Sequence, residues 1–157
     1  MAISDLVNDY VQRYTGVLLS STAVTGEYVD GGTGYMPTGW APLTAVSEVY
    51  DMVEDAAVDT DEYYYTGSGN IVKTIGTWGD GLQRYRISYT AGYSSVPPGL
   101  TQAITMIEAE ANKITASTGL YKSETNNGYS YTMQDSAVAQ AIVIHHGLLD
   151  AYRRIVV

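Results

Sequence analysis

The stretch RISYTAGYSSVPPGLTQAI, residues 86–104, changes from a strand pattern to a helix pattern near its middle. With Tyr85 just before it, Ile87 and Tyr89 fall on one face of an alternating strand. Pro97 and Pro98 cannot continue a sheet interior, but proline is favoured in the first turn of a helix, where its missing N–H costs nothing. The stretch therefore predicts a junction between a β-rich region and a helix. We assign this structural junction to Tyr89, Gly92, Tyr93, Pro97 and Pro98.

Helical periodicity lies on both sides of the β-rich region. Apolar residues spaced three and four apart predict one helix at about residues 3–15, a second at about 97–118 and a third at about 135–154. The apolar stripes consist of Ile3, Leu6, Val7, Tyr10, Val11 and Tyr14 in the first helix, Ile104, Ile107, Ala111 and Ile114 in the second, and Val138, Ile142, His145, Leu149 and Tyr152 in the third.

The region between the first two helices, about residues 17–91, is dense in glycine and carries short runs of β-branched and aromatic residues. Its clearest hairpin is DEYYYTGSGNIVKTI (61–75), a tyrosine-rich strand, a GSGN loop and a second strand. We therefore predict a single α+β domain over residues 1–157, with about three helices packed as a bundle and a β-rich insert between the first and second helices.

The composition favours contact with other proteins. Only 16% of the 157 residues are charged, below the usual share of about 25%. The chain has 15 Tyr and no Phe, and a tyrosine combines a large apolar ring with a hydroxyl that can meet a partner. The formal net charge is −9, from 8 basic and 17 acidic residues, so we expect no sequence-specific binding to nucleic acid.

Several other classes of protein are disfavoured. The chain has no cysteine, which excludes disulfides and thiolate zinc sites. No run approaches 18 apolar residues, and residues 1–10 lack the pattern of a signal peptide. We therefore expect no membrane span and synthesis in a reducing compartment.

No motif for catalysis or metal binding stands out. His145 and His146 are adjacent, so on a helix they point about 100° apart and cannot readily share one metal ion. The DTDE segment (59–62) lacks the later ligands of a calcium loop, and DGGTG (30–34) lacks the ending of a phosphate loop. No serine lies in a GxSxG elbow, and no spacing selects the carboxylate pair of a glycosidase. We therefore expect no enzymatic activity, no metal and no cofactor.

Taken in order, several segments resemble the head–tail connector proteins of long-tailed bacteriophages, also called head-completion or adaptor proteins. These segments are VNDYVQRYTGVLL (7–19), APLTAVSEVY (41–50), the run at 58–104, YKSETNNGYSYTM (121–133) and LLDAYRRIVV (148–157). The run at 58–104 is the most specific, because it combines the hairpin, a Trp-Gly turn, a Tyr-x-Ala-Gly-Tyr strand end and a Val-Pro helix start. The resemblance covers nearly the whole chain.

This resemblance implies a structural virion protein that forms a ring, usually dodecameric, under the portal protein after DNA packaging. Such a ring extends the DNA channel, lets double-stranded DNA pass without sequence-specific binding, and carries the stopper or tail-completion protein. It is made in the host bacterial cytoplasm and resides at the head–tail interface of the virion. Two alternatives stay open: another neck or tail-completion protein, with a ring of other symmetry, or a carbohydrate-binding module whose Trp40 and Trp78 stack on sugar rings.

Three sets of residues are candidate contacts in such a ring. Basic residues followed by an apolar tail predict portal contact; they are Arg153, Arg154, Ile155, Val156 and Val157. Two carboxylates lie off the apolar stripe of the second helix, where an acidic lining would repel sliding DNA; these candidate channel residues are Glu108 and Glu110. The polar loop before the third helix is a candidate for contact within the ring or with the next protein, through Ser123, Glu124, Asn126, Asn127, Tyr129 and Tyr131.

Overall fold

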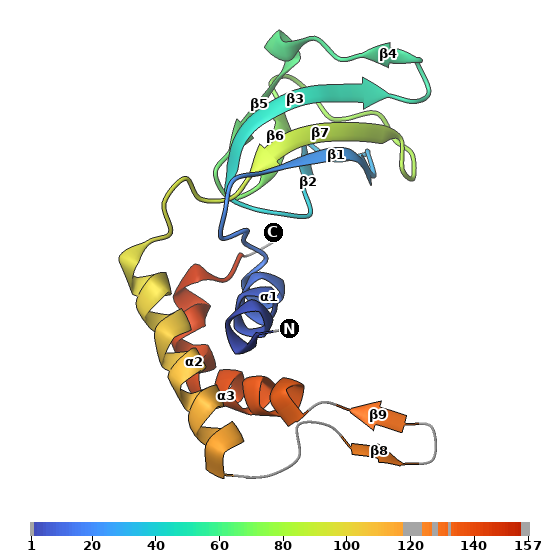
Figure 1. Cartoon of the computed structure of the whole chain (residues 1–157). Helices are drawn as coiled ribbons and strands as arrows, with labels where there is room; N and C mark the ends of the chain where they lie inside the picture. Colours follow the sequence, from blue (N-terminus) through green and yellow to red (C-terminus); the bar gives the residue numbers. More distant parts are fainter. Residues whose placement is uncertain (1, 118–123, 127–128, 132, 155–157) are drawn as a thin grey trace. The chain divides into compact units, whose positions relative to one another are not determined.

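The structure is a computed structural model, and it describes residues 2–117, 124–126, 129–131 and 133–154 (Figure 1). The chain divides into two compact units. The helical unit comprises Met1–Thr15 and Val96–Arg153, and the β unit comprises Gly16–Ser95 and Arg154–Val157. Each unit is described separately below.

The β unit contains two antiparallel sheets. The four-stranded sheet has the order β1-β7-β3-β4, and the three-stranded sheet has the order β2-β6-β5. Their bounds are β1 (Thr22–Val29), β7 (Tyr85–Ala91), β3 (Leu43–Asp51) and β4 (Ala56–Ala57) in the first sheet, and β2 (Tyr35–Pro37), β6 (Asn70–Lys73) and β5 (Tyr63–Thr66) in the second. A single 3-10 turn, η1 (Thr60–Glu62), leads into β5.

Strand β7 is the central strand of the larger sheet. It pairs with β1 on one side and with β3 on the other, so that Ile87 lies opposite both Glu27 and Val49. Its burial alternates strictly, with Tyr85, Ile87, Tyr89 and Ala91 buried and the residues between them half-buried. The alternation that is visible in the sequence thus marks the face of the sheet that is packed on the core.

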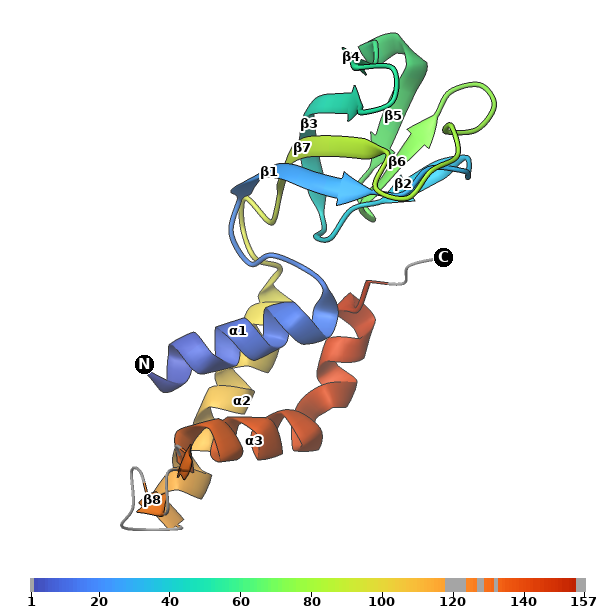
Figure 2. The ribbon, with the colours of Figure 1, turned by 90° about the vertical axis from the view of Figure 1, so that its right-hand side faces the viewer.

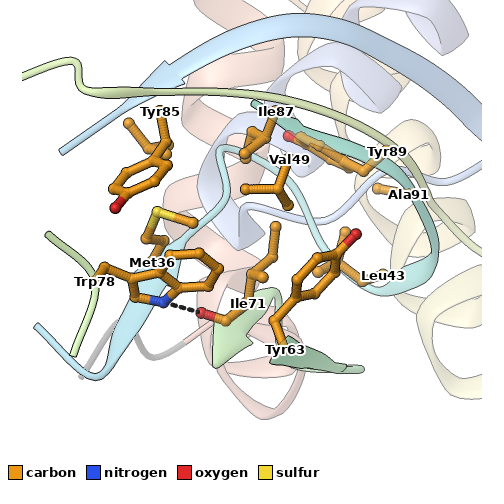
Figure 3. Packing of buried hydrophobic residues seen from close by; sticks show 11 residues of the cluster. Met36, Leu43, Val49, Tyr63, Ile71, Trp78, Tyr85, Ile87, Tyr89 and Ala91 are labelled. Carbon is orange, nitrogen blue, oxygen red and sulfur yellow. Dashed lines mark hydrogen bonds between the residues drawn. The ribbon is translucent and has the colours of Figure 1, made fainter. Parts of the chain in front are cut away.

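The core of the β unit lies between the two sheets and contains one buried tryptophan (Figure 3). Trp78 is 1% exposed, and its Nε1–H donates a hydrogen bond to the carbonyl oxygen of Ile71 at 3.3 Å. Its ring meets Tyr85 edge-on, at 5.1 Å between centroids, and lies 6.1 Å from Tyr63. Tyr85 belongs to the larger sheet and Tyr63 to the smaller one, so Trp78 packs against both sheets. Burial of a side chain of this size contributes roughly 1.5–3 kcal/mol or more.

The end of β7 requires a glycine. Gly92 has a φ of +111°, and a Cβ at this position would lie 2.0 Å from the carbonyl oxygen of Ser20. Its N–H donates to the carbonyl of Pro42 at 2.9 Å. Any other residue would therefore both strain the backbone and displace the neighbouring segment.

The helical unit contains three helices (Figure 2). They are α1 (Ile3–Thr15), α2 (Pro98–Ser117) and α3 (Met133–Leu149), with a 3-10 turn, η2 (Asp150–Tyr152), after α3 and a short antiparallel ribbon of β8 (Glu124–Asn126) and β9 (Tyr129–Tyr131) before it. The buried apolar residues are Val7, Val11, Leu100, Ala103, Ile107, Ala111, Ala137, Val138, Ala141, Ile142 and Leu149. In addition, the hydroxyl of Tyr14 in α1 donates to the Asp150 carboxylate at 2.6 Å.

The prediction of a three-helix bundle that carries a β-rich insert is wrong. Seven strands form two antiparallel sheets with a core of eleven buried residues, so the β region is a compact unit in its own right. One helix precedes it in the chain and two follow it. Within the helical unit the helices cross, and α3 bends along its length instead of running beside α2 as in a bundle (Figure 2).

The physical reason lies in the residues at the helix contacts. Several of the buried positions of α2 and α3 are alanine, namely Ala103, Ala111, Ala137 and Ala141. Small residues allow a close crossing of two helices, whereas a bundle needs a long seam of large apolar residues. Periodicity gives the position of a helix in the sequence, but it does not give its crossing angle.

We predict that Ile71→Ala destabilises the β unit by about 2–5 kcal/mol, because Ile71 is fully buried and the smaller side chain leaves a cavity. Ile75→Ala is the matched control: Ile75 is 85% exposed, so its loss should change stability by less than about 0.5 kcal/mol. Urea unfolding followed by tryptophan fluorescence measures both, since Trp40 and Trp78 lie in the β unit. Equal effects of the two substitutions would contradict the assigned core.

Candidate interaction surfaces

The described part of the chain offers no obvious site for a metal ion. Among those residues, no three His, Asp or Glu side chains come together as possible ligands. No described helix is long and apolar enough to cross a bilayer. The structure was therefore searched for surfaces that could contact other macromolecules.

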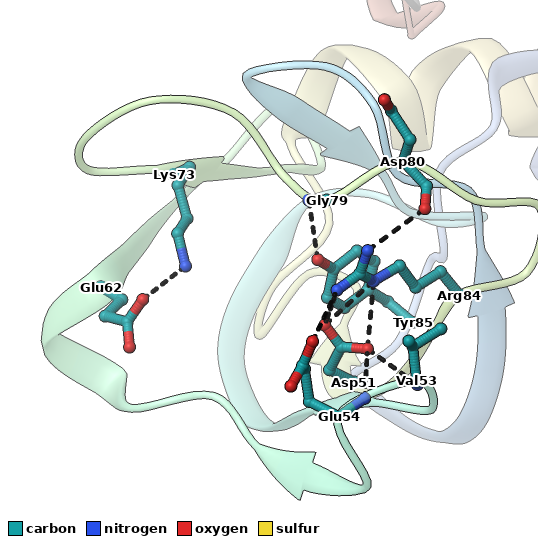
Figure 4. Close-up of polar contacts among 9 residues, drawn as sticks. All are labelled: Asp51, Val53, Glu54, Glu62, Lys73, Gly79, Asp80, Arg84 and Tyr85. Atoms are coloured by element: carbon teal, nitrogen blue, oxygen red, sulfur yellow. Dashed lines mark hydrogen bonds and ion pairs between the residues drawn. The ribbon is translucent and has the colours of Figure 1, made fainter.

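A bidentate ion pair ties two loops of the β unit together (Figure 4). The guanidinium of Arg84 donates to the carboxylate of Asp51 from Nη2 at 2.8 Å and from Nε at 3.0 Å. The same carboxylate accepts the backbone N–H groups of Val53, at 2.9 Å, and Glu54, at 3.2 Å. The Met52 N–H donates to the Arg84 carbonyl at 2.9 Å. These contacts fix the turn after β3 against the loop before β7.

The protonation of Asp51 is set by the same contacts. Burial alone raises the pKa of Asp51, but the hydrogen bonds from Arg84, Val53 and Glu54 outweigh it and lower this pKa below its ordinary value. The Arg84 pKa is raised in turn by its hydrogen bond to Asp51. Both groups are therefore charged at neutral pH, and the pair is most stable there.

The ion pair supports a surface of exposed apolar side chains, which we call the tip surface. It consists of Met52 at 44%, Val53 at 68% and Leu82 at 87% exposure. The Glu54 and Asp80 carboxylates lie beside it, and the Asp80 carbonyl accepts a hydrogen bond from Arg84 at 3.2 Å. Exposed apolar side chains among carboxylates, on loops held by a half-buried ion pair, suit a protein contact. The sequence gives little signal for this surface, because Asp51 and Arg84 are 33 residues apart.

The predicted junction residues divide between the two units. Tyr89, Gly92 and Tyr93 belong to the β unit, and Pro97 and Pro98 belong to the helical unit, where α2 begins at Pro98. Proline thus occupies the first helical position, as its geometry favours.

Tyr89 lies in the core of the β unit. Its hydroxyl donates to the Glu27 carboxylate at 2.5 Å, and the other carboxylate oxygen accepts the Gly39 N–H at 2.6 Å. Burial and the hydrogen bond to Glu27 raise the pKa of Tyr89 well above its ordinary value. Tyr89 is therefore neutral at any physiological pH and has a packing role.

The two candidate arginines of the C-terminal segment have different environments. Arg154 donates to the carbonyls of Thr38 and, at 2.7 Å, of Gly69. Gly69 has a φ of +90°, and a Cβ there would lie 2.9 Å from the Arg154 Cζ, so the loop approaches the guanidinium closely. Burial lowers the pKa of Arg154, although Tyr89 and Glu27 oppose this change. Arg153 instead lies over the ring of Tyr14, at 5.5 Å from its centroid.

This difference bears on the predicted portal contact. Arg154 is engaged within the β unit, whereas Arg153 is exposed in the helical unit. The remaining candidates, residues 155–157, lie outside the described residues. Contact of this segment with a portal stays a prediction.

The predicted channel residues both lie half-buried on α2. Glu110 is 3.8 Å from Lys113, one turn later, and the backbone carbonyl of Glu108 accepts the Asn112 side chain at 2.8 Å. Ordinary intrahelical contacts thus account for their local surroundings, and their role in a channel stays a prediction.

The predicted contact loop contains the ribbon of β8 and β9. Its backbone pairs Glu124 with Tyr131 and Asn126 with Tyr129. Ser123 and Asn127 lie outside the described residues. A ribbon that projects before α3 is consistent with a contact element, and that role too stays a prediction.

The carbohydrate-binding alternative depended on two tryptophans. Trp78 is 1% exposed and lies inside the core, so its ring face cannot stack on a sugar. Trp40 is half-buried and packs against the same core. This alternative therefore has no support in the geometry.

Comparisons with known proteins give matches by structure alone. No protein-family model matches the chain, and no curated protein matches it. The chain is similar to one in the neck of the native gene transfer agent (GTA) particle computed with C12 symmetry, with a TM-score of 0.53, 16% identity, and 99% of this chain and 81% of that one covered.

Two further GTA structures match over a similar extent. One is the virion of the native GTA particle, with a TM-score of 0.53, 16% identity, and 99% of this chain and 76% of that one covered. The other is the neck of the empty GTA particle computed with C6 symmetry, with a TM-score of 0.54, 15% identity and the same coverage, 99% and 76%. At this identity the likeness establishes a shared fold.

We predict that Asp51→Asn destabilises the β unit by about 1.5–3 kcal/mol at pH 7, because it removes a charge-assisted pair. The folded-state pKa of Asp51 is lower than its unfolded-state value of about 3.9. The carboxylate therefore stabilises the fold above that value, and its contribution is lost as pH falls through the folded-state pKa. The difference between wild type and variant should thus be constant above about pH 5 and shrink below about pH 4.

Glu54→Gln is the control for this prediction. The Glu54 side chain is 72% exposed and lies 3.7 Å from Arg84, so its loss should cost less than about 1 kcal/mol. Urea unfolding at pH 7, 5 and 3 measures both variants. An Asp51→Asn effect that does not depend on pH would refute the assigned role of the carboxylate.

We predict that Arg154→Ala destabilises the β unit by about 1–3 kcal/mol, because two carbonyls lose their donor. Arg153→Ala is the neighbouring control and removes only a contact with the Tyr14 ring, worth about 0.5–1 kcal/mol. Tryptophan fluorescence during urea unfolding reports the β unit. If Arg153→Ala shifts that transition as much as Arg154→Ala, the assigned contact of Arg154 is incorrect.

Proposed function

We propose that this protein is a structural component of the neck of a phage-like particle, a head–tail connector that forms a ring under the portal. The observation that carries the proposal is the similarity of fold over 99% of the chain to a chain in the GTA neck computed with C12 symmetry. The ordered motifs that resemble the connector family, above all the run at 58–104, support the same role. The role is structural and not catalytic, and the place of action is the virion, after synthesis in the host bacterial cytoplasm.

The surface chemistry supports assembly with other proteins. The chain has few charges and many tyrosines, and its tip surface presents Met52, Val53 and Leu82 on loops held by the Asp51–Arg84 pair. An apolar surface on a fixed loop can be covered by a partner at little cost in conformational entropy. In the proposed neck, this surface contacts the next component, the stopper or tail-completion protein.

The net charge of −9 suits a ring through which DNA passes. Phosphate binding needs clustered Lys and Arg, and a channel that held the duplex in this way would impede its movement. An acidic or neutral wall repels the duplex instead. Glu108 and Glu110 are the proposed lining residues.

The portal contact is proposed for the C-terminal segment. Because Arg154 already donates to Thr38 and Gly69, Arg153 is the arginine that can bind a partner without first breaking contacts within the β unit. If Arg154 also binds the portal, those hydrogen bonds must open on docking.

Another neck or tail-completion protein is the second candidate. The matched structures carry the name of the neck without the name of a component, and one was computed with C6 symmetry. Such a protein would share the ring and the virion location, but it would differ in copy number and in its neighbours.

We predict that the purified protein, mixed with its cognate portal, forms a second ring stacked coaxially on the portal, with twelve copies. The reason is that a ring on a symmetric template closes through many small, identical contacts. Electron microscopy of the mixture, of the protein alone and of the portal alone measures this. A coaxial ring with another copy number would favour the second candidate, and no association at any salt concentration would refute the connector role.

A further inference from the structure

Helix α3 is apolar on both its inner and its outer face. Over residues 137–149 it has no Asp, Glu, Lys or Arg. Its inner face is buried through Ala137, Val138, Ala141, Ile142 and Leu149. On the outer face, Val143 is 70% exposed, Ile144 is 59% exposed and Leu148 is 44% exposed. A helix that is hydrophobic all round is ordinarily buried, so this outer face lacks its cover in the single chain.

A groove extends this apolar face toward α2. It has a volume of about 400 Å³ and is lined by Gly99, Gln102, Met106, Gly147, Leu148 and Tyr152, among others. Met106 is itself 41% exposed, and no heavy atom lies within 4 Å of the place where a Cβ of Gly147 would stand. Val143, Ile144, Met106 and Leu148 thus form one surface with an open depression, which we call the α3 face.

We propose that the α3 face is covered by a second copy of this chain and forms the subunit contact of the ring. This inference rests on the proposed function, because a ring places each copy against two others. It adds the residues through which one copy meets the next, which neither the resemblance nor the comparisons give.

Charge favours a second copy over an unlike partner. Each copy carries a net charge of −9, so two copies repel wherever their acidic surfaces meet. They can approach closely only through a surface without charge, because like charges brought together cost several kcal/mol. The α3 face is such a surface, since its residues are apolar and α3 has no charged side chain between residues 137 and 149. The tip surface, by contrast, lies beside the Glu54 and Asp80 carboxylates and suits an unlike partner.

The ring symmetry sets the geometry of this contact. In a closed ring of more than two copies the contact is heterologous, so the α3 face of one copy covers a different surface of the next. A contact of this kind links every copy to two neighbours, whereas an isologous contact joins only two copies. Chemical linkage from a single position can distinguish the two cases.

Ile144→Asp tests the inference, with Val53→Asp as the matched control. Ile144 and Val53 are both exposed, at 59% and 68%, so neither substitution should unfold the chain, which circular dichroism verifies. In the mixture with the cognate portal, Ile144→Asp should lower the yield of rings at least about tenfold, because a buried, unpaired charge would lie in the contact. Val53→Asp should leave the ring yield of this chain unchanged.

The outcomes separate this inference from the proposed function. If wild type forms rings and Ile144→Asp forms them equally well, the α3 face is not the subunit contact, while the connector role stands. If wild type itself forms no ring with the portal, the connector role fails and the inference fails with it.

Photo-crosslinking gives a second readout that does not depend on a disruptive charge. Val143 is replaced by p-benzoylphenylalanine, and Val53, of nearly equal exposure at 68% against 70%, is replaced in the control. Irradiation of the ring should give a ladder of oligomers from position 143 and none from position 53. A product from position 143 that stops at the dimer would overturn the heterologous contact, and no product would overturn the α3 face as a contact.

Discussion

The burial of Trp78 between the two sheets is the interaction on which the β unit depends. Its ring packs against Tyr63 of the smaller sheet and Tyr85 of the larger one, and its Nε1–H satisfies the carbonyl of Ile71. Its own backbone N–H and carbonyl bind Thr33 and Gly32, so the loop before β2 is fixed to the same residue. The Asp51–Arg84 pair lies beside Tyr85, with the Arg84 guanidinium over the Tyr85 ring. The loops that carry the tip surface are therefore held from the core outward.

The two units present surfaces of different chemistry. The β unit offers apolar side chains beside carboxylates, on loops fixed by an ion pair. The helical unit offers the α3 face, which is apolar and without charge. For a chain with a net charge of −9, this difference can separate two kinds of partner, because a like-charged copy is tolerated only at the uncharged surface. An assembly of many identical copies that also holds unlike neighbours needs such a separation.

Sequence periodicity located the helices and the central strand, because both depend on the local repeat of apolar residues. It failed for the packing of the helices, since small contact residues such as Ala103 and Ala141 change how helices cross without changing the period. It placed His145 on the buried stripe of the last helix, but the structure leaves His145 half-buried and turns Ile144 outward. The Asp51–Arg84 pair and the contacts of Arg154 join residues far apart in the chain, so no local pattern could have given them.

The central claim is that copies of this chain form a ring in the neck of a phage-like particle. Cryo-electron microscopy of the intact particle, reconstructed at the neck without imposed symmetry, tests it most directly. The account predicts density in which twelve copies of this fold, each with its α3 face against a neighbour, lie in one ring between portal and tail. A neck in which this fold is absent, while the protein is detected elsewhere in the particle or only outside it, would contradict the account.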